Sequence, residues 1–274
     1  MNKVTLVGAG GKMGCRITDN LKNSKYEISY LEINPQGIER LKARGVTVSN
    51  PEEAIPQADF VILAVPDIYI KNVAHDIVPK MKPGSMALCL DPAAPLAGAL
   101  PERNDVSYFA SHPAHPSIYN HETDPKDHYD YFGGISAKQA IVCALIQGKE
   151  ENYVLGENLA NTIYAPVFRS HRITIEQMGI LEPALSETFT ASCLVMMREA
   201  LDEVVRQGVP KEAARDFLLG HINIISAVLF EEIQGVFSDA CNKAIEIGKP
   251  MIFKEDWKKV FDPESVKQQI KAIT

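Results

Sequence analysis

The chain has 274 residues, of which 46% are hydrophobic and 23% are charged, which is typical of a globular protein and excludes a disordered or collagen-like chain. It carries 28 Lys and Arg residues against 35 Asp and Glu residues, and the resulting net charge of −7 repels nucleic acid and anionic membrane surfaces. No apolar run reaches the roughly 18–20 residues of a membrane helix, and the first residues have the pattern of a strand rather than of a signal peptide. We therefore expect a cytoplasmic protein of two domains that binds neither nucleic acid nor membranes.

The first 116 residues alternate between short apolar runs and amphipathic segments. Strands are predicted at 3–8, 27–32, 46–49, 59–66, 85–90 and 106–110, and helices at 12–21, 36–44, 51–58 and 67–79. The strand at 59–66, DFVILAVP, is the most apolar of these and is expected at the centre of the sheet, buried on both faces. This alternation predicts an α/β fold, a doubly wound parallel sheet of the Rossmann type.

Residues 117–131 are polar, which favours a surface excursion rather than a core element. Two further strands are predicted at 139–147 and 165–173, around a helix at 150–162, and we expect them to extend the same sheet. The first domain is therefore predicted to span residues 1–173.

From residue 174 the pattern is almost purely helical. Long helices are predicted at 175–207 and 211–234, with shorter ones to the end of the chain. Residues 174–274 are thus predicted to form an all-helical domain, and because mostly apolar helical segments of this kind commonly pack against a copy of themselves, we expect a homodimer.

A glycine-rich turn joins the first strand to the first helix. Small residues there let the backbone approach a pyrophosphate, and the helix N-terminus offers free N–H groups. The spacing, GxGxxxG, is weak by itself, but its place between strand and helix favours a dinucleotide-binding turn. The residues of this turn predicted to bind the cofactor are Gly8, Gly10, Gly11, Lys12, Met13 and Gly14.

Glu32 ends the second strand, 18 residues after Gly14, where a carboxylate can accept hydrogen bonds from both ribose hydroxyls and would repel a 2′-phosphate. It therefore favours NAD over NADP; the alternative is a packing turn with a surface glutamate. Pro66, Asp67 and Pro92 follow two later strands and are expected to line the nicotinamide side. Asp67 could equally be the N-cap of its helix.

The stretch SHPAHP places His112 and His115 on a proline-stiffened loop directly after a strand, at the edge of the sheet where ligands bind. Oxidation of a hydroxyl by NAD needs a base for the departing proton, and histidine titrates in the useful range. Two imidazoles can also ligate a divalent metal, but further ligands are then needed. The alternative is a rigid loop whose histidines bond the backbone.

In the helical part, Glu182 precedes Pro183, which should kink the helix and place the glutamate at a bend with free carbonyls nearby. We rank Glu182 first and Glu187 second as a substrate or metal ligand; the alternative is ordinary solvated glutamates. His221 lies in the apolar segment 217–230. It is either a core histidine or the residue that completes a site with His115 and Glu182.

The GAGGKMG turn, the VILAVPD strand and the His-Pro after the last of the parallel strands resemble the superfamily of prephenate and β-hydroxyacid dehydrogenases, in which a Rossmann domain precedes a helical dimerisation domain. Over nearly the whole chain, longer blocks are similar to the NAD-dependent D-apionate oxidoisomerase family: LDPAAP, SHPAHPSIYN, FGGISAKQAIVCALIQG, EQMGILEPALSETF and RDFLLGHINI. The chain departs from the β-hydroxyacid dehydrogenases because no lysine lies between Lys149 and Lys211, so their catalytic lysine has no counterpart.

The resemblance implies oxidation of a branched sugar acid, D-apionate, at its 2-hydroxyl by NAD, followed by migration of a hydroxymethyl group to give 3-oxo-isoapionate. Such an acyloin shift needs a Lewis acid, so we expect one divalent metal ion with His115, Glu182 and His221 as ligands and His112 as base. This ligand set rests on residue type and expected position. The alternatives are a simple NAD-dependent hydroxyacid or sugar-acid dehydrogenase without rearrangement or metal, and a non-catalytic NAD sensor.

Overall fold

The computed structural model describes residues 2–274 and divides into two compact units. The first runs to Pro183 and includes Lys267–Thr274, and the second is Ala184–Val266. These units differ in extent from the predicted domains 1–173 and 174–274. The first part of the helical segment belongs with the sheet because Met178 is buried against strand residues Ala110 and Ala144.

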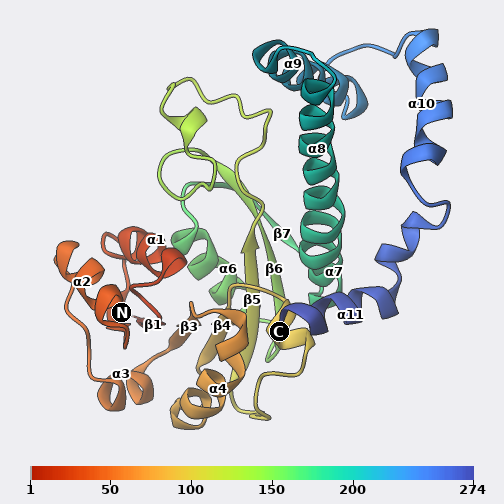
Figure 1. Cartoon of the computed structure of the whole chain (residues 1–274). Helices are drawn as coiled ribbons and strands as arrows, with labels where there is room; N and C mark the ends of the chain where they lie inside the picture. Colours follow the sequence, from red (N-terminus) through yellow and green to blue (C-terminus); the bar gives the residue numbers. More distant parts are fainter. Residues whose placement is uncertain (1) are drawn as a thin grey trace. The chain divides into compact units, whose positions relative to one another are not determined.

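Within residues 2–274, seven strands form one sheet in the order β2-β1-β3-β4-β5-β6-β7 (Figure 1). All neighbouring strands are parallel except β5 and β6, which are antiparallel. The predicted α/β fold and the extension of its sheet are therefore confirmed. The strands are β1 (Lys3–Val7), β2 (Glu27–Leu31), β3 (Phe60–Leu63), β4 (Met86–Cys89), β5 (Ser107–Pro113), β6 (Gln139–Gln147) and β7 (Val167–Arg172).

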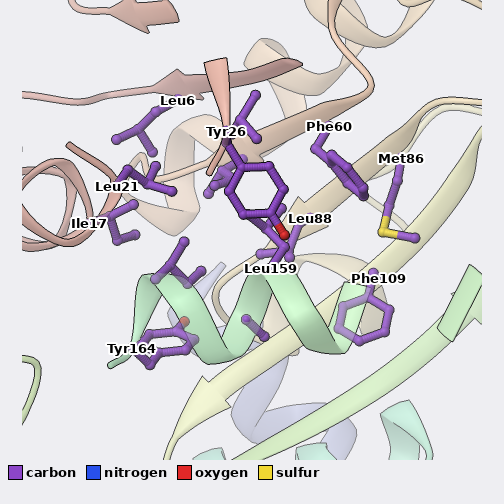
Figure 2. Close-up of a cluster of buried hydrophobic side chains, with 14 of the residues drawn as sticks. Leu6, Ile17, Leu21, Tyr26, Phe60, Met86, Leu88, Phe109, Leu159 and Tyr164 are labelled. Carbon is purple, nitrogen blue, oxygen red and sulfur yellow. The ribbon is translucent and has the colours of Figure 1, made fainter. Parts of the chain in front are cut away.

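Helices cover both faces of the sheet, because successive strand residues point to opposite sides. On one face, Leu6 and Leu88 join Ile17 of α1 and Leu159 of α6 in a buried cluster (Figure 2). On the other face lie α3, α4 and α5. The α-helices up to residue 163 are α1 (Lys12–Leu21), α2 (Pro35–Ala43), α3 (Pro51–Gln57), α4 (Asp67–Ile77) with η1 (Val78–Lys80), α5 (Ala93–Leu96) and α6 (Asn152–Ile163).

The predicted strand at 46–49 is wrong. Val46 closes the end of α2 by donating its N–H to the Leu41 carbonyl, and the Ser49 N–H donates to the Tyr30 carbonyl of β2 at 2.8 Å. The segment runs beside the edge strand β2 without forming a ladder with it. It is therefore a connecting segment between α2 and α3.

The polar segment between β5 and β6 contains only a short turn of helix, η2 (Asp127–Tyr129). It is nevertheless anchored internally. The buried carboxylate of Asp130 accepts hydrogen bonds from the backbone N–H groups of Ile135, Ser136 and Ala137 at 2.9–3.1 Å. Three bonds to one carboxylate oxygen hold the returning part of this segment in a defined conformation.

The long helix predicted from residue 175 begins at a capping box between Thr174 and Gln177. It continues as α7 (Ile175–Gly179), the π-helix η3 (Ile180–Ala191) and α8 (Ser192–Arg206). The expected bend at Pro183 is therefore a π-helical stretch, in which the missing proline N–H is accommodated by a wider turn.

The second unit contains α8, α9 (Lys211–Leu229), α10 (Asp239–Ile252) and η4 (Trp257–Phe261), and the chain ends with α11 (Pro263–Ile273). Helix α9 ends at Leu229 rather than at the predicted Gln234. Glu231 adopts a left-handed conformation with φ of 61°, which a continuing right-handed helix excludes. Over residues 2–274, none of the helices has both the length and the apolar character that crossing a bilayer requires.

Candidate active site

The glycine-rich turn lies where the sequence predicts it, between β1 and α1. Gly8 has φ of 77°, and a Cβ there would lie 2.4 Å from the Ala64 carbonyl oxygen. A Cβ on Gly14 would lie 2.0 Å from the Gly8 carbonyl oxygen. Gly11 is the N-cap of α1, and since it has no side chain, the first N–H groups of the helix are left to an external anion.

Glu32 is held against this turn. Its Oε2 accepts the Gly10 N–H at 2.8 Å, and its Oε1 accepts the N–H groups of Ile33 and Asn34, both at 2.9 Å. The carboxylate thus lies at the end of β2 with a fixed orientation beside the dinucleotide turn. Its predicted bonds to ribose hydroxyls stay a prediction.

Pro66, Asp67 and Pro92 lie at the carboxyl ends of β3 and β4, as expected. Asp67 is the first residue of α4, whose N-cap is Pro66, so the alternative of Asp67 as an N-cap is wrong. Pro92 is the N-cap of α5, and the Ala93 N–H that follows it donates to Asp91 Oδ1 at 2.7 Å.

His112 lies at the centre of the candidate site, next to the last residue of β5. Its Nδ1 donates to the Leu90 carbonyl at 2.8 Å, and its Nε2 lies 3.1 Å from Oε2 of Glu182. Oδ2 of Asp91 lies 4.0 Å from Nδ1. Because a carbonyl can only accept, Nδ1 carries a proton, and Nε2 is the nitrogen that can exchange a proton or bind a metal.

The neighbour of His112 explains why β5 holds this position. Ser111 donates its hydroxyl to the Val142 carbonyl at 3.0 Å, and its own carbonyl accepts the buried Tyr164 hydroxyl at 2.9 Å. The strand also runs to Pro113, three residues beyond the predicted end at Ala110. His112 is therefore part of the sheet rather than of a loop.

The surroundings of His112 and Glu182 favour an ion pair. Burial lowers the pKa of His112, but the hydrogen bond and charge of Glu182, with the Leu90 carbonyl and the charge of Asp91, outweigh it and hold this pKa above its usual value. Burial raises the pKa of Glu182, but the hydrogen bond and charge of His112, with the charge of His115, hold it below its usual value overall. Between the two pKa values the pair is an imidazolium and a carboxylate.

The site carries a surplus of negative charge. Burial raises the pKa of Asp91 to about 6 against the Ala93 N–H and the charge of His112, which lower it, and the charges of Asp67 and Glu182 add to the increase. Burial likewise raises the pKa of Asp67, and the charge of Glu182 adds to it. Three carboxylates accompany one imidazole here, and this arrangement favours an additional cation.

The geometry fits a divalent metal ion. Over residues 2–274, one group of three metal-ligating side chains has its ligand atoms within 4.8 Å of one another, and it consists of Asp91, His112 and Glu182. Two carboxylates and an imidazole are a suitable ligand set for a divalent cation. Only Glu182 is shared with the predicted set. Asp91 was missed as a ligand, although its place directly after β4 was a signal.

His115 lies next to His112, with ring centroids 6.2 Å apart and planes nearly perpendicular. Its Nδ1 donates to the Phe132 carbonyl at 2.9 Å, and its backbone has φ of 61°, a conformation uncommon for residues other than glycine. The bond to Phe132 leaves Nε2 of His115 to accept a proton. Both histidines bond the backbone, as in the rigid-loop alternative, but each keeps one nitrogen for chemistry.

Glu187 and His221 belong to the second unit. Glu187 is exposed on η3. His221 is exposed on α9, bonds the Phe217 carbonyl at 2.8 Å and stacks on the Phe217 ring at 4.0 Å, so the core-histidine alternative is wrong. The participation of His221 in a metal site stays a prediction.

Two family models match the chain. Residues 120–274 match the phosphogluconate dehydrogenase (decarboxylating) C-terminal domain, and residues 1–91 match the NADPH-binding domain of acetohydroxy acid isomeroreductase. The first match covers Phe132, the helix that carries Glu182 and the whole second unit, and it begins after His115.

Full-length relatives are similar to the chain throughout. The D-apionate oxidoisomerase of Cupriavidus necator is 56% identical, with 99% of each chain covered, and that of Rhizobium rhizogenes is 54% identical, with 100% of each covered. The crystal structure of a semialdehyde dehydrogenase NAD-binding protein from Cupriavidus necator, in complex with calcium and NAD, superposes with a TM-score of 0.99 at 55% identity and covers 100% of both chains. The chain therefore belongs to the D-apionate oxidoisomerase family.

Proposed function

We propose that the protein oxidises a branched sugar acid, D-apionate, with NAD and rearranges the product to 3-oxo-isoapionate. The names of the full-length relatives support this substrate. The observation that carries the proposal is the Asp91, His112 and Glu182 group beside His115, because it offers a metal site and a separate base at one edge of the sheet.

NAD is proposed as the cofactor. The uncapped start of α1 suits a diphosphate, and Glu32, fixed beside Gly10, suits ribose hydroxyls and disfavours a 2′-phosphate. The similar protein of known structure from Cupriavidus necator was solved with NAD.

The roles of the two histidines follow from their hydrogen bonds. Nε2 of His112 cannot hold a metal and accept a substrate proton at once, and its Nδ1 is occupied by Leu90. With a divalent cation held by Asp91, His112 and Glu182, the base is His115, whose Nε2 accepts the proton of the C2 hydroxyl. The same hydroxyl carbon loses its hydride to oxidised NAD, which leaves a 2-oxo acid.

The rearrangement then changes no oxidation state overall. The C3 hydroxyl gives up its proton to solvent, the hydroxymethyl carbon moves from C3 to C2 with its bonding electrons, C3 becomes a carbonyl and the C2 oxygen takes a proton. His115, which received the first proton, returns it to the C2 oxygen. A divalent cation held by Asp91, His112 and Glu182 would supply the Lewis acid that such a shift needs.

A simple dehydrogenase is the second candidate function. The existing contact between His112 and Glu182 favours it, because this pair, without a metal, can itself accept the hydroxyl proton once His112 is neutral. In that case no rearrangement follows, and the product is the 2-oxo acid.

The decisive experiment incubates the purified protein with NAD and D-apionate, with and without a chelator, and identifies the product by NMR. We expect 3-oxo-isoapionate, lost with chelator, and an oxidation rate at least about 100-fold lower in His115→Ala, with His171→Ala on β7 as control. Elemental analysis of Asp91→Asn, Glu182→Ala and His221→Ala compares the two ligand sets. An unrearranged, chelator-insensitive product would establish the simple dehydrogenase.

We further propose that the protein is a cytoplasmic homodimer. The second unit exposes a large amount of apolar surface, which in a soluble monomer is unfavourable and typical of an interface. Its side chains that are more than half exposed include Leu194, Val195, Phe217, Leu229, Phe230, Val236, Ile247, Met251 and Ile252.

A further inference from the structure

Phe132, in the segment between β5 and β6, contacts two cations of the dinucleotide-binding helix. The Lys12 Nζ lies 4.5 Å from the centre of its ring, and the Arg16 guanidinium carbon lies 4.2 Å from it. Lys12 is the first residue of α1, and Arg16 follows four residues later. The two cations repel each other, and Lys12 also lies unfavourably at the positive end of the helix dipole, so a compensating group is needed.

The ring compensates in part, because the negative face of an aromatic ring attracts cations. A bound diphosphate at the start of α1 would compensate for the rest of the positive charge of Lys12 and Arg16. The ammonium and guanidinium groups keep donors that do not face the ring, so both can contact Phe132 and an anion together.

The same residue also holds His115. The Phe132 carbonyl accepts the His115 Nδ1–H at 2.9 Å, and the two rings meet edge to face with centroids 5.8 Å apart. His115 has a left-handed backbone, which costs free energy and persists only where its surroundings maintain it. Phe132 is therefore one of the groups that fix where Nε2 of His115 lies.

The backbone that follows Phe132 is held in place by hydrogen bonds to Asp130. Asp130 anchors the returning backbone three residues later, beginning with the Ile135 N–H. Phe132 is 45% exposed, so the position of its ring depends on Lys12, Arg16 and His115 more than on burial in a core.

We propose that Phe132 is a positioning residue that couples the dinucleotide-binding turn to His115. Its ring holds Lys12 and Arg16 where the NAD diphosphate binds, and its carbonyl holds His115 beside His112. The proposal rests on the proposed function for the role of His115, but the contacts that carry it are independent of the substrate.

The test compares Phe132→Leu, Phe132→Tyr and Tyr131→Leu. Tyr131 is the neighbouring aromatic residue, 72% exposed, and serves as the matched control. NAD affinity is measured by titration calorimetry without substrate, and the His115 imidazole is followed by NMR of histidine-labelled protein. Loss of two exposed cation–π contacts in Phe132→Leu should weaken NAD binding about fivefold to tenfold and shift the His115 resonances. Phe132→Tyr, which keeps the ring, should restore both.

A double-mutant cycle tests whether the Phe132 ring acts through Arg16. If the ring acts through Arg16, Arg16→Met and Phe132→Leu should weaken NAD binding by less together than the product of their separate effects. In turnover, Phe132→Leu should raise the KM for NAD and also lower kcat, since the ring contacts with Lys12 and Arg16 and the edge-to-face contact with His115 are lost while the carbonyl remains.

Unchanged NAD affinity and unchanged His115 resonances in a folded Phe132→Leu variant would overturn the proposal, and so would an equal effect of Tyr131→Leu. A wild-type protein that binds NAD but does not convert D-apionate would instead contradict the proposed function and leave the coupling intact.

Discussion

His112 is the residue whose immediate contacts decide what the site can do. With Nδ1 committed to the Leu90 carbonyl, Nε2 faces Glu182 and can hold either a proton or a metal ion. Asp91 and Asp67 add negative charge around this position, which favours either the protonated imidazole or a bound metal ion. The second imidazole, His115, is then needed as a base because the first is occupied.

The effect of Glu182 on His112 can be measured directly. In metal-free protein without NAD, His112 should titrate above its usual pKa, because Glu182 outweighs burial. In Glu182→Gln the carboxylate charge is gone, burial dominates, and the pKa of His112 should fall. NMR titration of labelled histidines measures this, with the exposed His75 as an internal reference. A pKa of His112 that is the same in both proteins would contradict the assigned pair.

Glu32 is the second residue on which specificity depends. Glu32→Gln replaces an acceptor that serves Gly10, Ile33 and Asn34 and is proposed to serve the ribose. We expect NAD binding to weaken about tenfold and discrimination against NADP to decrease, since hydrogen bonds to a charged group contribute roughly 1.5–3 kcal/mol. Calorimetry with both cofactors tests this, with Glu39→Gln on the exposed side of α2 as control. Equal affinities in wild type and Glu32→Gln would place the glutamate outside the cofactor site.

At the scale of elements, the site depends on how closely α1 approaches the glycine turn. The helix can start beside β1 because Gly14 presents no Cβ to the Gly8 carbonyl, 2.0 Å from where that atom would lie. The same close approach directs the N-terminus of α1 toward the cofactor. Helix packing and cofactor binding therefore both require a residue without a side chain at position 14.

Gly14→Ala should test this requirement. The added methyl would meet backbone atoms of Gly8 and Ala9, which cannot move aside as a side chain can. We expect a loss of about 2–3 kcal/mol in stability, seen as a clear fall in the thermal unfolding midpoint, together with loss of NAD binding. Asp19→Ala, an exposed change on the same helix, should cost under about 1 kcal/mol. A Gly14→Ala protein as stable as wild type would show that the turn is looser than described.

At the scale of the whole molecule, the two units differ in how they bury their apolar residues. The sheet unit encloses extensive hydrophobic clusters, whereas α8 and α9 contribute only Ala214 and Ala227 as buried residues. A unit that leaves Phe217, Leu229 and Phe230 exposed is expected to bury them in an assembly.

Sedimentation of the wild-type protein should therefore give a dimer at micromolar concentration. Replacing Leu229 and Phe230 with Glu should raise the dissociation constant at least about 100-fold, because two exposed apolar side chains would lose burial in the interface. Val154→Glu, on α6 of the sheet unit, is the control. A monomeric wild type, or a dimer unaffected by the double substitution, would contradict a homodimer built on α9.

The sequence alone determined the elements and the position of the cofactor turn, because hydrophobic periodicity and glycine spacing are local properties of the chain. Helix 12–21 and strand 139–147 have the predicted bounds, and His112 was singled out from the SHPAHP stretch, although it lies in β5 rather than in a loop after it. Only the tertiary structure decided that Asp91 and Glu182 meet His112, since these residues come from separate elements and depend on strand order and on the helix after β7. It also decided that 46–49 forms no ladder and that Pro183 lies in a π-helix, because both depend on backbone hydrogen bonds that residue patterns do not specify.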